Sequence, residues 1–316
     1  MSTETTDGDA VQTKMDDLRS SKKIRRIKMV IAVVLTGVVL YFSYTTVGFS
    51  ITELVEYWPE FVEALGGYFP ITTYFGVIPF LDFGRYWQFI VEASLFQKSV
   101  VTVGMAIGGT ALGLPGALIL GTLGSERVMP FPFNFIFRST MSVIRSVPAL
   151  VWALIFIPLG GVSPFTGTLA IGVDTMGYLG RLFTDELEEI ESGPIEGIES
   201  TGAGKGQTVI FGMLSQVYRQ FIAWMLFILE LNVRIAITLG LIGAGGLGYE
   251  LMIQRQTFQY TNMMSAIIVT VLLVLSVETI SQRTRAYLRH DEDDESKGLV
   301  QRITEFPQRM AETAWK

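Results

Sequence analysis

The chain has 316 residues, of which 49% are apolar, and it contains 32 glycines, one histidine and no cysteine. A mean hydropathy of +0.42 is typical of a polytopic helical membrane protein, because this much apolar surface needs lipid or a very large core to cover it. The residue counts exclude disulfides, thiol chemistry and metal sites built from cysteine or several histidines. We therefore predict no metal site and no catalytic residue.

The formal net charge of −6 comes partly from the ends of the chain. Of the 30 acidic residues, five lie in residues 1–28 and seven in residues 291–316. Runs of like charge are typically solvated. We predict two cytoplasmic tails, a basic and acidic one at 1–28 and an acidic one at 286–316, and no nucleic-acid partner.

Six apolar runs are long enough to cross a hydrocarbon layer of about 30 Å, which takes about 20 helical residues. The first run follows a basic segment, but it is too long for a signal-peptide core and no small-x-small cleavage site follows, so we expect a retained helix. The sequence predicts an all-α polytopic membrane protein with six transmembrane helices. The runs are residues 29–49, 98–121, 141–161, 165–183, 216–243 and 262–280.

The distribution of Lys and Arg predicts the orientation in the cell membrane. With the N-terminus inside, 19 of the 24 basic residues fall in cytoplasmic segments. Cytoplasmic loops carry the excess of positive charge in membrane proteins. Both termini should therefore be cytoplasmic.

The external part of segment 29–97 is rich in aromatic residues from position 50 onward. Within it, "ITELVEYWPEFVEAL" predicts an interfacial helix with Glu53, Glu56, Glu60 and Glu63 on its polar side. Two roles remain open, a lid over the ends of the spans and a docking surface for an external partner.

Glycines and prolines inside the spans predict how the helices pack. Small residues let helix backbones approach in lipid, where no hydrophobic effect draws helices together. Prolines kink or end helices. The packing glycines are the pairs Gly104 and Gly108, Gly109 and Gly113, and Gly177 and Gly180, and the prolines are Pro115, Pro148 and Pro158.

Charged residues inside the predicted spans are the first candidate site. In "ELNVR", Glu230 and Arg234 lie one turn apart on one helical face. A lone charge in the bilayer costs about 2.5 to 3.5 kcal/mol, so such residues pair and face the protein interior or a water-filled path. Asn232 points to another face and should bond a neighbouring helix, while Asp174 is a second intramembrane carboxylate for which Arg234 and Arg145 are candidate partners. The pair either holds the bundle together or lines a path for an anion.

The polar segment 184–213 is the second candidate. Its "STGAGKGQT" suggests a phosphate-binding loop, but that motif needs glycine at 199 and Ser or Thr at 206, where the chain has Glu199 and Gly206. We therefore exclude nucleotide binding by this chain. Pro194 near a helix start and a break at Gly202 predict two short helices on the cytoplasmic side.

Within this segment, "EGIESTG", nine further residues and "GML" resemble the cytoplasmic EAA loop of ABC importer permeases. The pattern of that loop is E-A-A, three residues, G, nine residues and I-x-L-P. Glu196 matches its glutamate, Gly202 its glycine and Leu214 its leucine. Gly197 and Ile198 stand for the two alanines, Gly212 for the isoleucine and Ser215 for the proline.

Two longer stretches narrow the resemblance. "RSVPALVWA" and "ELNVRIAITLGLIGAGGLG" resemble the phosphonate-type ABC transporter permease subunit, in which R-S-[VI]-P-E-L-V-W-A and E-[IL]-N-V-R followed by L-G-L-[IV]-G-A-G-G-[IL]-G recur. Ala149 stands where this pattern has an acidic residue. The resemblance covers about residues 98–285, which we take as the permease core.

The resemblance implies the type I ABC importer permease fold and import of phosphonate, phosphite or phosphate by alternating access. It implies a permease homodimer in lipid, a cytoplasmic ABC ATPase dimer that holds ATP and Mg²⁺, and an external substrate-binding protein; this chain itself would bind no cofactor. Two residue sets follow. The coupling residues are Glu196, Gly197, Gly202 and Leu214; the intramembrane polar residues, which either line the translocation path or hold the bundle, are Arg145, Asp174, Glu230, Asn232 and Arg234.

Two alternatives remain at the level of the sequence. One is an importer of the same class for another small anion or an amino acid. The other is an ion-coupled secondary transporter in which Asp174, Glu230 and Arg234 form a relay. A coupling loop has no purpose without an ATPase, and the two halves of the chain show no evident inverted repeat, so the importer is favoured.

Overall fold

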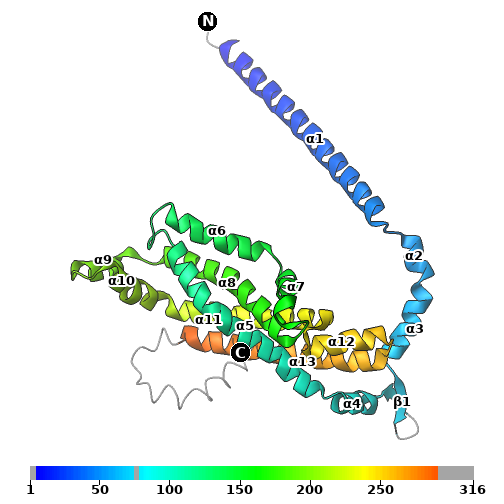
Figure 1. Ribbon diagram of the computed structural model, residues 1–316. Helices are drawn as coiled ribbons and strands as arrows, with labels where there is room; N and C mark the ends of the chain where they lie inside the picture. Colours follow the sequence, from blue (N-terminus) through cyan, green and yellow to red (C-terminus); the bar gives the residue numbers. More distant parts are fainter. Residues whose placement is uncertain (1–4, 75–77, 291–316) are drawn as a thin grey trace. The chain divides into compact units, whose positions relative to one another are not determined.

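The computed structural model describes residues 5–74 and 78–290 (Figure 1). The chain divides into two compact units after Glu63. Most of the predicted acidic C-terminal tail, residues 291–316, lies outside the described residues.

The first unit contains α1 (Thr5–Val47), α2 (Ile51–Glu56) and the start of α3 (Trp58–Tyr68). The apolar part of α1, residues 22–47, is long and apolar enough to cross a membrane. The single helix predicted for "ITELVEYWPEFVEAL" is interrupted at Tyr57. The Ser50 hydroxyl caps α2 by accepting a hydrogen bond from the backbone N–H of Glu53.

The second unit opens with a small hairpin that the sequence did not predict. Strands β1 (Ile71–Tyr74) and β2 (Ile78–Leu81) pair antiparallel, with Ile71 opposite Leu81. Helix α4 (Phe83–Glu92) follows, and its Tyr86 hydroxyl donates to the backbone oxygen of Tyr68 at 2.6 Å. Burial, with a smaller effect of Asp82, raises the pKa of Tyr86 above its ordinary value.

The two central helices, α5 (Leu95–Gly124) and α8 (Pro164–Glu189), lie side by side (Figure 1). Glycines allow this approach, because a Cβ at Gly113 would lie 2.4 Å from the backbone oxygen of Gly172 and one at Gly121 would lie 2.6 Å from that of Gly180. The packing predicted for Gly113 is thus confirmed. Gly104 makes no such contact within the described chain, because a Cβ built there would have nothing beyond its chain neighbours and its own helix backbone within 4 Å.

The third predicted span, 141–161, is not one straight helix. Helices α6 (Phe133–Ser146) and α7 (Ala149–Gly160) meet at a bend of 88°. Pro148 lies at this junction, where its ring disfavours a helical conformation at Val147. The expectation that Pro148 kinks or ends a helix is confirmed. The single predicted span at 141–161 is replaced by the bent pair of α6 and α7.

The rest of the second unit is helical. α9 (Ser192–Ser200) and α10 (Lys205–Gln207) precede a π-helical segment, Thr208–Leu214, which continues into α11 (Ser215–Leu239). A second π-helical segment, Gly240–Ala244, leads to α12 (Gly246–Gln256), and α13 (Tyr260–His290) ends the described chain.

Helix α12 was not predicted as a separate element. Gly243 and Gly245, with φ of 105° and 97°, end the preceding helix in a conformation that side chains rarely adopt. A Cβ at Gly248 would lie 1.9 Å from the backbone oxygen of Ile237, so α12 packs directly on the backbone of α11. An ion pair between Lys98 and the buried Glu250 joins it to α5.

Four described helices are long and apolar enough to cross a membrane, and the bent pair of α6 and α7 makes a possible fifth. The protein is therefore a multi-pass membrane protein, and α8 is the predicted span that lacks the required apolarity. Helix α8 packs against α5, α6, α7 and α11. A helix that protein surrounds needs little lipid-facing surface, so its threonines, glycines and Asp174 are compatible with a position inside the bundle.

Candidate functional site

The polar segment between α8 and α11 forms a bent loop. Pro194 lies in the first turn of α9, where a missing N–H costs no helical hydrogen bond. The helix ends at Ser200, and Gly202 has a φ of 81°, which a residue with a side chain rarely adopts. The predicted pair of short elements with a break at Gly202 is present. The second element, however, is continuous with α11 through the π-helical segment.

Helix α9 has an inner apolar face and an outer polar one. Ile195 and Ile198 are half-buried, and Ile195 packs against the apolar cluster between α8 and α11. Glu196, Gly197 and Glu199 are exposed. A carboxylate beside a residue without a side chain gives the outer face a small, negatively charged knob.

The departures from the EAA pattern at Ile198 and Gly212 belong to one contact. Gly212 is buried, and a Cβ there would lie 3.3 Å from Cδ1 of Ile198. The EAA pattern has alanine where this chain has Ile198 and isoleucine where it has Gly212. The isoleucine of the contact is therefore on the other partner in this chain. The sequence shows two unrelated substitutions, whereas the structure shows one exchange of volume.

This exchange predicts compensation between two substitutions. Ile198→Ala should lower the free energy of unfolding by about 1–3 kcal/mol by leaving a void, and Gly212→Ile by a similar amount by overpacking. The double variant should recover most of both losses, as thermal unfolding of the purified protein in detergent would show. Gly197→Ala is the control, because a Cβ there would have, among the described residues, only its chain neighbours and its own helix backbone within 4 Å. Additive losses in the double variant would contradict the contact.

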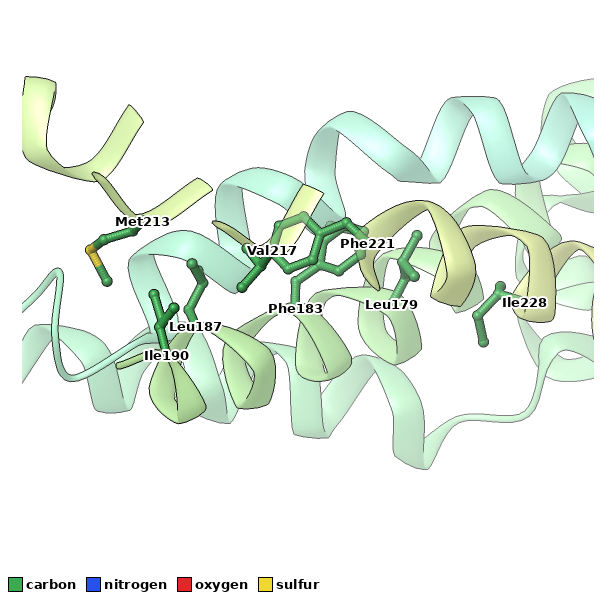
Figure 2. Packing of buried hydrophobic residues seen from close by; sticks show 9 residues of the cluster. Leu179, Phe183, Leu187, Ile190, Met213, Val217, Phe221 and Ile228 are labelled. Carbon is green, nitrogen blue, oxygen red and sulfur yellow. The ribbon is translucent and has the colours of Figure 1, made fainter. Parts of the chain in front are cut away.

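The loop is attached to the bundle by the apolar cluster that Figure 2 shows. The rings of Phe183 on α8 and Phe221 on α11 stack with centroids 3.9 Å apart and planes at 17°. Trp224 on α11 also donates to the Glu186 carboxylate on α8, at 2.7 Å. These contacts join the loop to both helices. The labelled residues are Leu179, Phe183, Leu187, Ile190, Met213, Val217, Phe221 and Ile228.

Glu188, at the end of α8, joins this helix to α6 and to the end of α5. Arg138 on α6 forms an ion pair with Glu188, and its Nε donates to the oxygen of Gly124 at the end of α5 at 2.7 Å. The backbone N–H of Glu126 donates to the Glu188 carboxylate at 3.0 Å. The sequence does not reveal this cluster, because its members lie on separate elements and have no motif in common.

The charges of α11 form a chain with α13. Arg234 bonds Glu230 at 2.9 Å and Glu278 at 3.3 Å, and Arg285 bonds the other oxygen of Glu230 at 3.1 Å. Glu230 is buried, at 7% exposure. The structure therefore brings Glu230 and Arg234 together and adds Glu278 and Arg285, which the sequence analysis missed because they lie on another helix.

Asn232 occupies the opposite side of α11. Its Nδ2 donates to the hydroxyls of Thr110 on α5 and Thr175 on α8, both at 2.8 Å. This side chain ties together three helices at a fully buried point. It lies among neighbouring helices, as its position on another face predicts.

A cavity of about 490 Å³ opens between α7, α8 and α11. Its wall on α7 includes Ala149, the position at which the phosphonate-type pattern has an acidic residue. The guanidinium of Arg145 lies outside this wall, over the ring of Tyr178 at 5.5 Å. The polar lining residues are Asp174, Thr175, Tyr178, Asn232, Arg234 and Thr238.

The pairing expected for Asp174 is wrong. Among the described residues, Arg234 forms its ion pairs with Glu230 and Glu278, and neither Arg234 nor Arg145 forms one with Asp174. The reason is local, because Glu230 is one turn from Arg234 on the same helix and engages it first. The cavity wall therefore carries a carboxylate and a guanidinium that do not bind each other.

Residues 113–290 match the family model described as "binding-protein-dependent transport system inner membrane component". Among curated relatives, the chain is 38% identical over 151 residues to a putative phosphite transport system permease protein, HtxE, of Stutzerimonas stutzeri, covering 48% of this chain and 58% of that one. It is 32% identical over 195 residues to the phosphate-import permease protein PhnE of Mycolicibacterium smegmatis, covering 61% and 37%. The matched part thus spans less than two thirds of either relative.

Solved structures share the fold at low sequence identity. An amino acid ABC transporter with histidines aligns with a TM-score of 0.54 at 15% identity, covering 64% of this chain and 97% of that one. The inward-facing MetNI methionine ABC transporter also aligns at 0.54, with 20% identity and coverage of 66% and 99%. The chain has the type I ABC importer permease fold. Because the family model covers more than half of its length, the chain belongs to the family of binding-protein-dependent transport system inner membrane components, which are transport subunits and not enzymes.

Proposed function

We propose that this chain is the transmembrane subunit of an ATP-driven importer that moves phosphonate, phosphite or phosphate into the cell by alternating access. The observation that carries the proposal is one continuous helix, residues 205–244, which begins in the coupling loop and carries Arg234 into the cavity. At about 1.5 Å per residue, roughly 40 Å separate its start from Arg234. A push on the loop moves this cationic wall of the cavity as one body.

The partners follow from that role. A cytoplasmic ATPase dimer holds ATP and Mg²⁺ and receives the exposed face of α9, where Glu196 meets a basic residue. An external binding protein delivers the substrate, and two copies of this chain enclose the path, with both termini in the cytoplasm. The names of the relatives, which refer to phosphite and phosphate, support the class of substrate. Arg234 supports it chemically, because a guanidinium presents several donors to an oxyanion.

Charge reversal at Glu196 tests the docking. The permease, its ATPase and its binding protein would be reconstituted in proteoliposomes, and uptake of phosphite, phosphate and methylphosphonate would be measured with ATP hydrolysis. We expect Glu196→Arg to lower uptake at least about tenfold and to lose ATPase on co-purification, with thermal stability unchanged because the side chain is exposed.

The matched control is Glu56→Arg, an equal charge reversal at an exposed position of the predicted external segment, which should retain the ATPase. Gly202→Leu should also uncouple transport, because its φ of 81° disfavours a side chain and the bend would open. Normal coupled uptake by both loop variants would refute the docking. Uptake driven by an ion gradient without an ATPase would refute the proposed function.

A further inference from the structure

Two opposite charges, Asp174 and Arg234, line the cavity between α7, α8 and α11 without forming an ion pair with each other. Asp174 is 5% exposed and lines the cavity, yet no hydrogen bond or ion pair joins its carboxylate to another described residue. Arg234 reaches the same cavity while Glu230 and Glu278 hold its guanidinium. A buried carboxylate without a partner is costly. Its retention beside a cationic wall therefore points to a ligand that satisfies both groups.

The chemistry of the two groups restricts that ligand. An ionised carboxylate only accepts hydrogen bonds, and a guanidinium only donates them. A fully deprotonated oxyanion would suit Arg234 but would bring like charge against Asp174. An oxyanion that keeps one acidic proton can accept from Arg234 with its charged oxygens and donate its P–OH to Asp174.

The other groups around Asp174 do not alter this balance. On α8, Tyr178 is occupied on its ring face by Arg145. On α11, both amide hydrogens of Asn232 are engaged by Thr110 and Thr175. The α7 wall contributes no charge to the lining. Arg234 and Asp174 are thus the charged residues that line the cavity.

The α7 wall supplies a second, independent observation. Ala149 lines the same cavity and stands where the phosphonate-type pattern has an acidic residue. In this chain the α7 wall therefore has no carboxylate at position 149, whereas the α8 wall has the carboxylate of Asp174. A carboxylate needed only to hold helices together would be bonded to a neighbouring helix, and Asp174 has no such bond within residues 5–74 and 78–290.

We infer that this cavity is a binding site for the singly protonated form of a small phosphorus oxyanion, with Asp174 as the acceptor of its proton and Arg234 as the donor to its charged oxygens. The inference rests on the proposed function and adds the protonation state to it. Transport should decline as pH rises through the second pKa of the substrate, by about tenfold per pH unit well above that pKa. An oxyanion without an acidic proton should be rejected by the permease itself.

The test is phosphite uptake per ATP hydrolysed in proteoliposomes over a pH series that spans the second ionisation of phosphite. The affinity of the binding protein for phosphite is measured separately at each pH and used to correct the rates. Wild type should show the decline. Asp174→Asn should show a flat profile, because its amide can donate to a deprotonated oxygen. Ala149→Glu combined with Asp174→Asn should restore the decline from the opposite wall.

A substrate pair gives a measurement that needs no variant. Methylphosphonate and its monomethyl ester each offer a single negative charge, but the ester has no acidic proton. The ester should be transported at least tenfold more slowly after correction for binding-protein affinity. Equal rates for the two, or the same pH profile in wild type and Asp174→Asn, would overturn the inference. Failure of the proposed function differs visibly, since wild type would then take up no phosphorus oxyanion at any pH.

Discussion

Replacing Gly113 with alanine is expected to lower the free energy of unfolding of the permease by about 2–3 kcal/mol. The new Cβ would lie 2.4 Å from the backbone oxygen of Gly172 and 2.8 Å from Cβ of Thr175. A backbone oxygen inside a helix has no rotamer by which to withdraw, so α5 and α8 must separate along their contact. The separation would also stretch the bonds from Asn232 to Thr110 and Thr175, which are both 2.8 Å long.

Gly104→Ala is the matched control, because it makes the same chemical change on the same helix. Apart from its chain neighbours and the backbone of α5 itself, no atom of the described residues lies within 4 Å of a Cβ there. Alanine is the better helix former, so this variant should be neutral or slightly more stable than wild type. Both would be compared by thermal unfolding in the same detergent. Equal effects at the two positions would show that α5 and α8 do not approach through Gly113.

Replacing Glu230 with glutamine should cost about 3 kcal/mol of stability. Glu230 is 7% exposed and receives both Arg234 and Arg285. Removing a buried partner leaves its cations without compensation, which costs more than the intact pairs contribute. Most of the loss should fall on Arg285, whose side chain is 22% exposed, since Arg234 is 42% exposed and keeps Glu278.

Glu278→Gln tests whether burial is the cause. The side chain of Glu278 is 34% exposed, forms its ion pair with Arg234 at 3.3 Å and accepts a hydrogen bond from Gln282, so its loss should cost less than about 1 kcal/mol. A double variant, Glu230→Leu with Arg285→Met, should be more stable than Glu230→Gln because no buried charge is left alone. Chemical unfolding would measure all three. Equal costs at Glu230 and Glu278 would contradict the central place of Glu230.

Features set by neighbouring residues could be predicted from the chain alone. The apolar runs at 29–49, 98–121, 216–243 and 262–280 coincide with helices in the structure, since a span depends on length and apolarity. The break at Gly202 and the pair of Glu230 and Arg234 are also local, one resting on a single φ and the other on one helical turn.

Features that depend on which helices meet could not be predicted. Pro148 predicted a kink or a helix end within the third span, but the bend of 88° between α6 and α7 could not be read from the sequence. The sequence predicts a span at 165–183, but α8 is less apolar than a helix that faces lipid. Its position among other helices explains this, because a helix surrounded by protein needs little apolar surface. The partners considered for Asp174 were wrong, because the sequence does not show which basic residue of another helix lies next to it.

The sequence by itself thus determined that the chain is a helical membrane protein of the importer permease class, with a bent polar loop and an ion pair on one helix. These follow from composition, periodicity and residues a few positions apart. Only the tertiary structure decided that Ile198 meets Gly212, that Arg285 and Glu278 complete the charge chain, and that Asp174 and Arg234 line one cavity without pairing. Those relations join residues on different helices, and their distances are set by where glycines let the backbones approach.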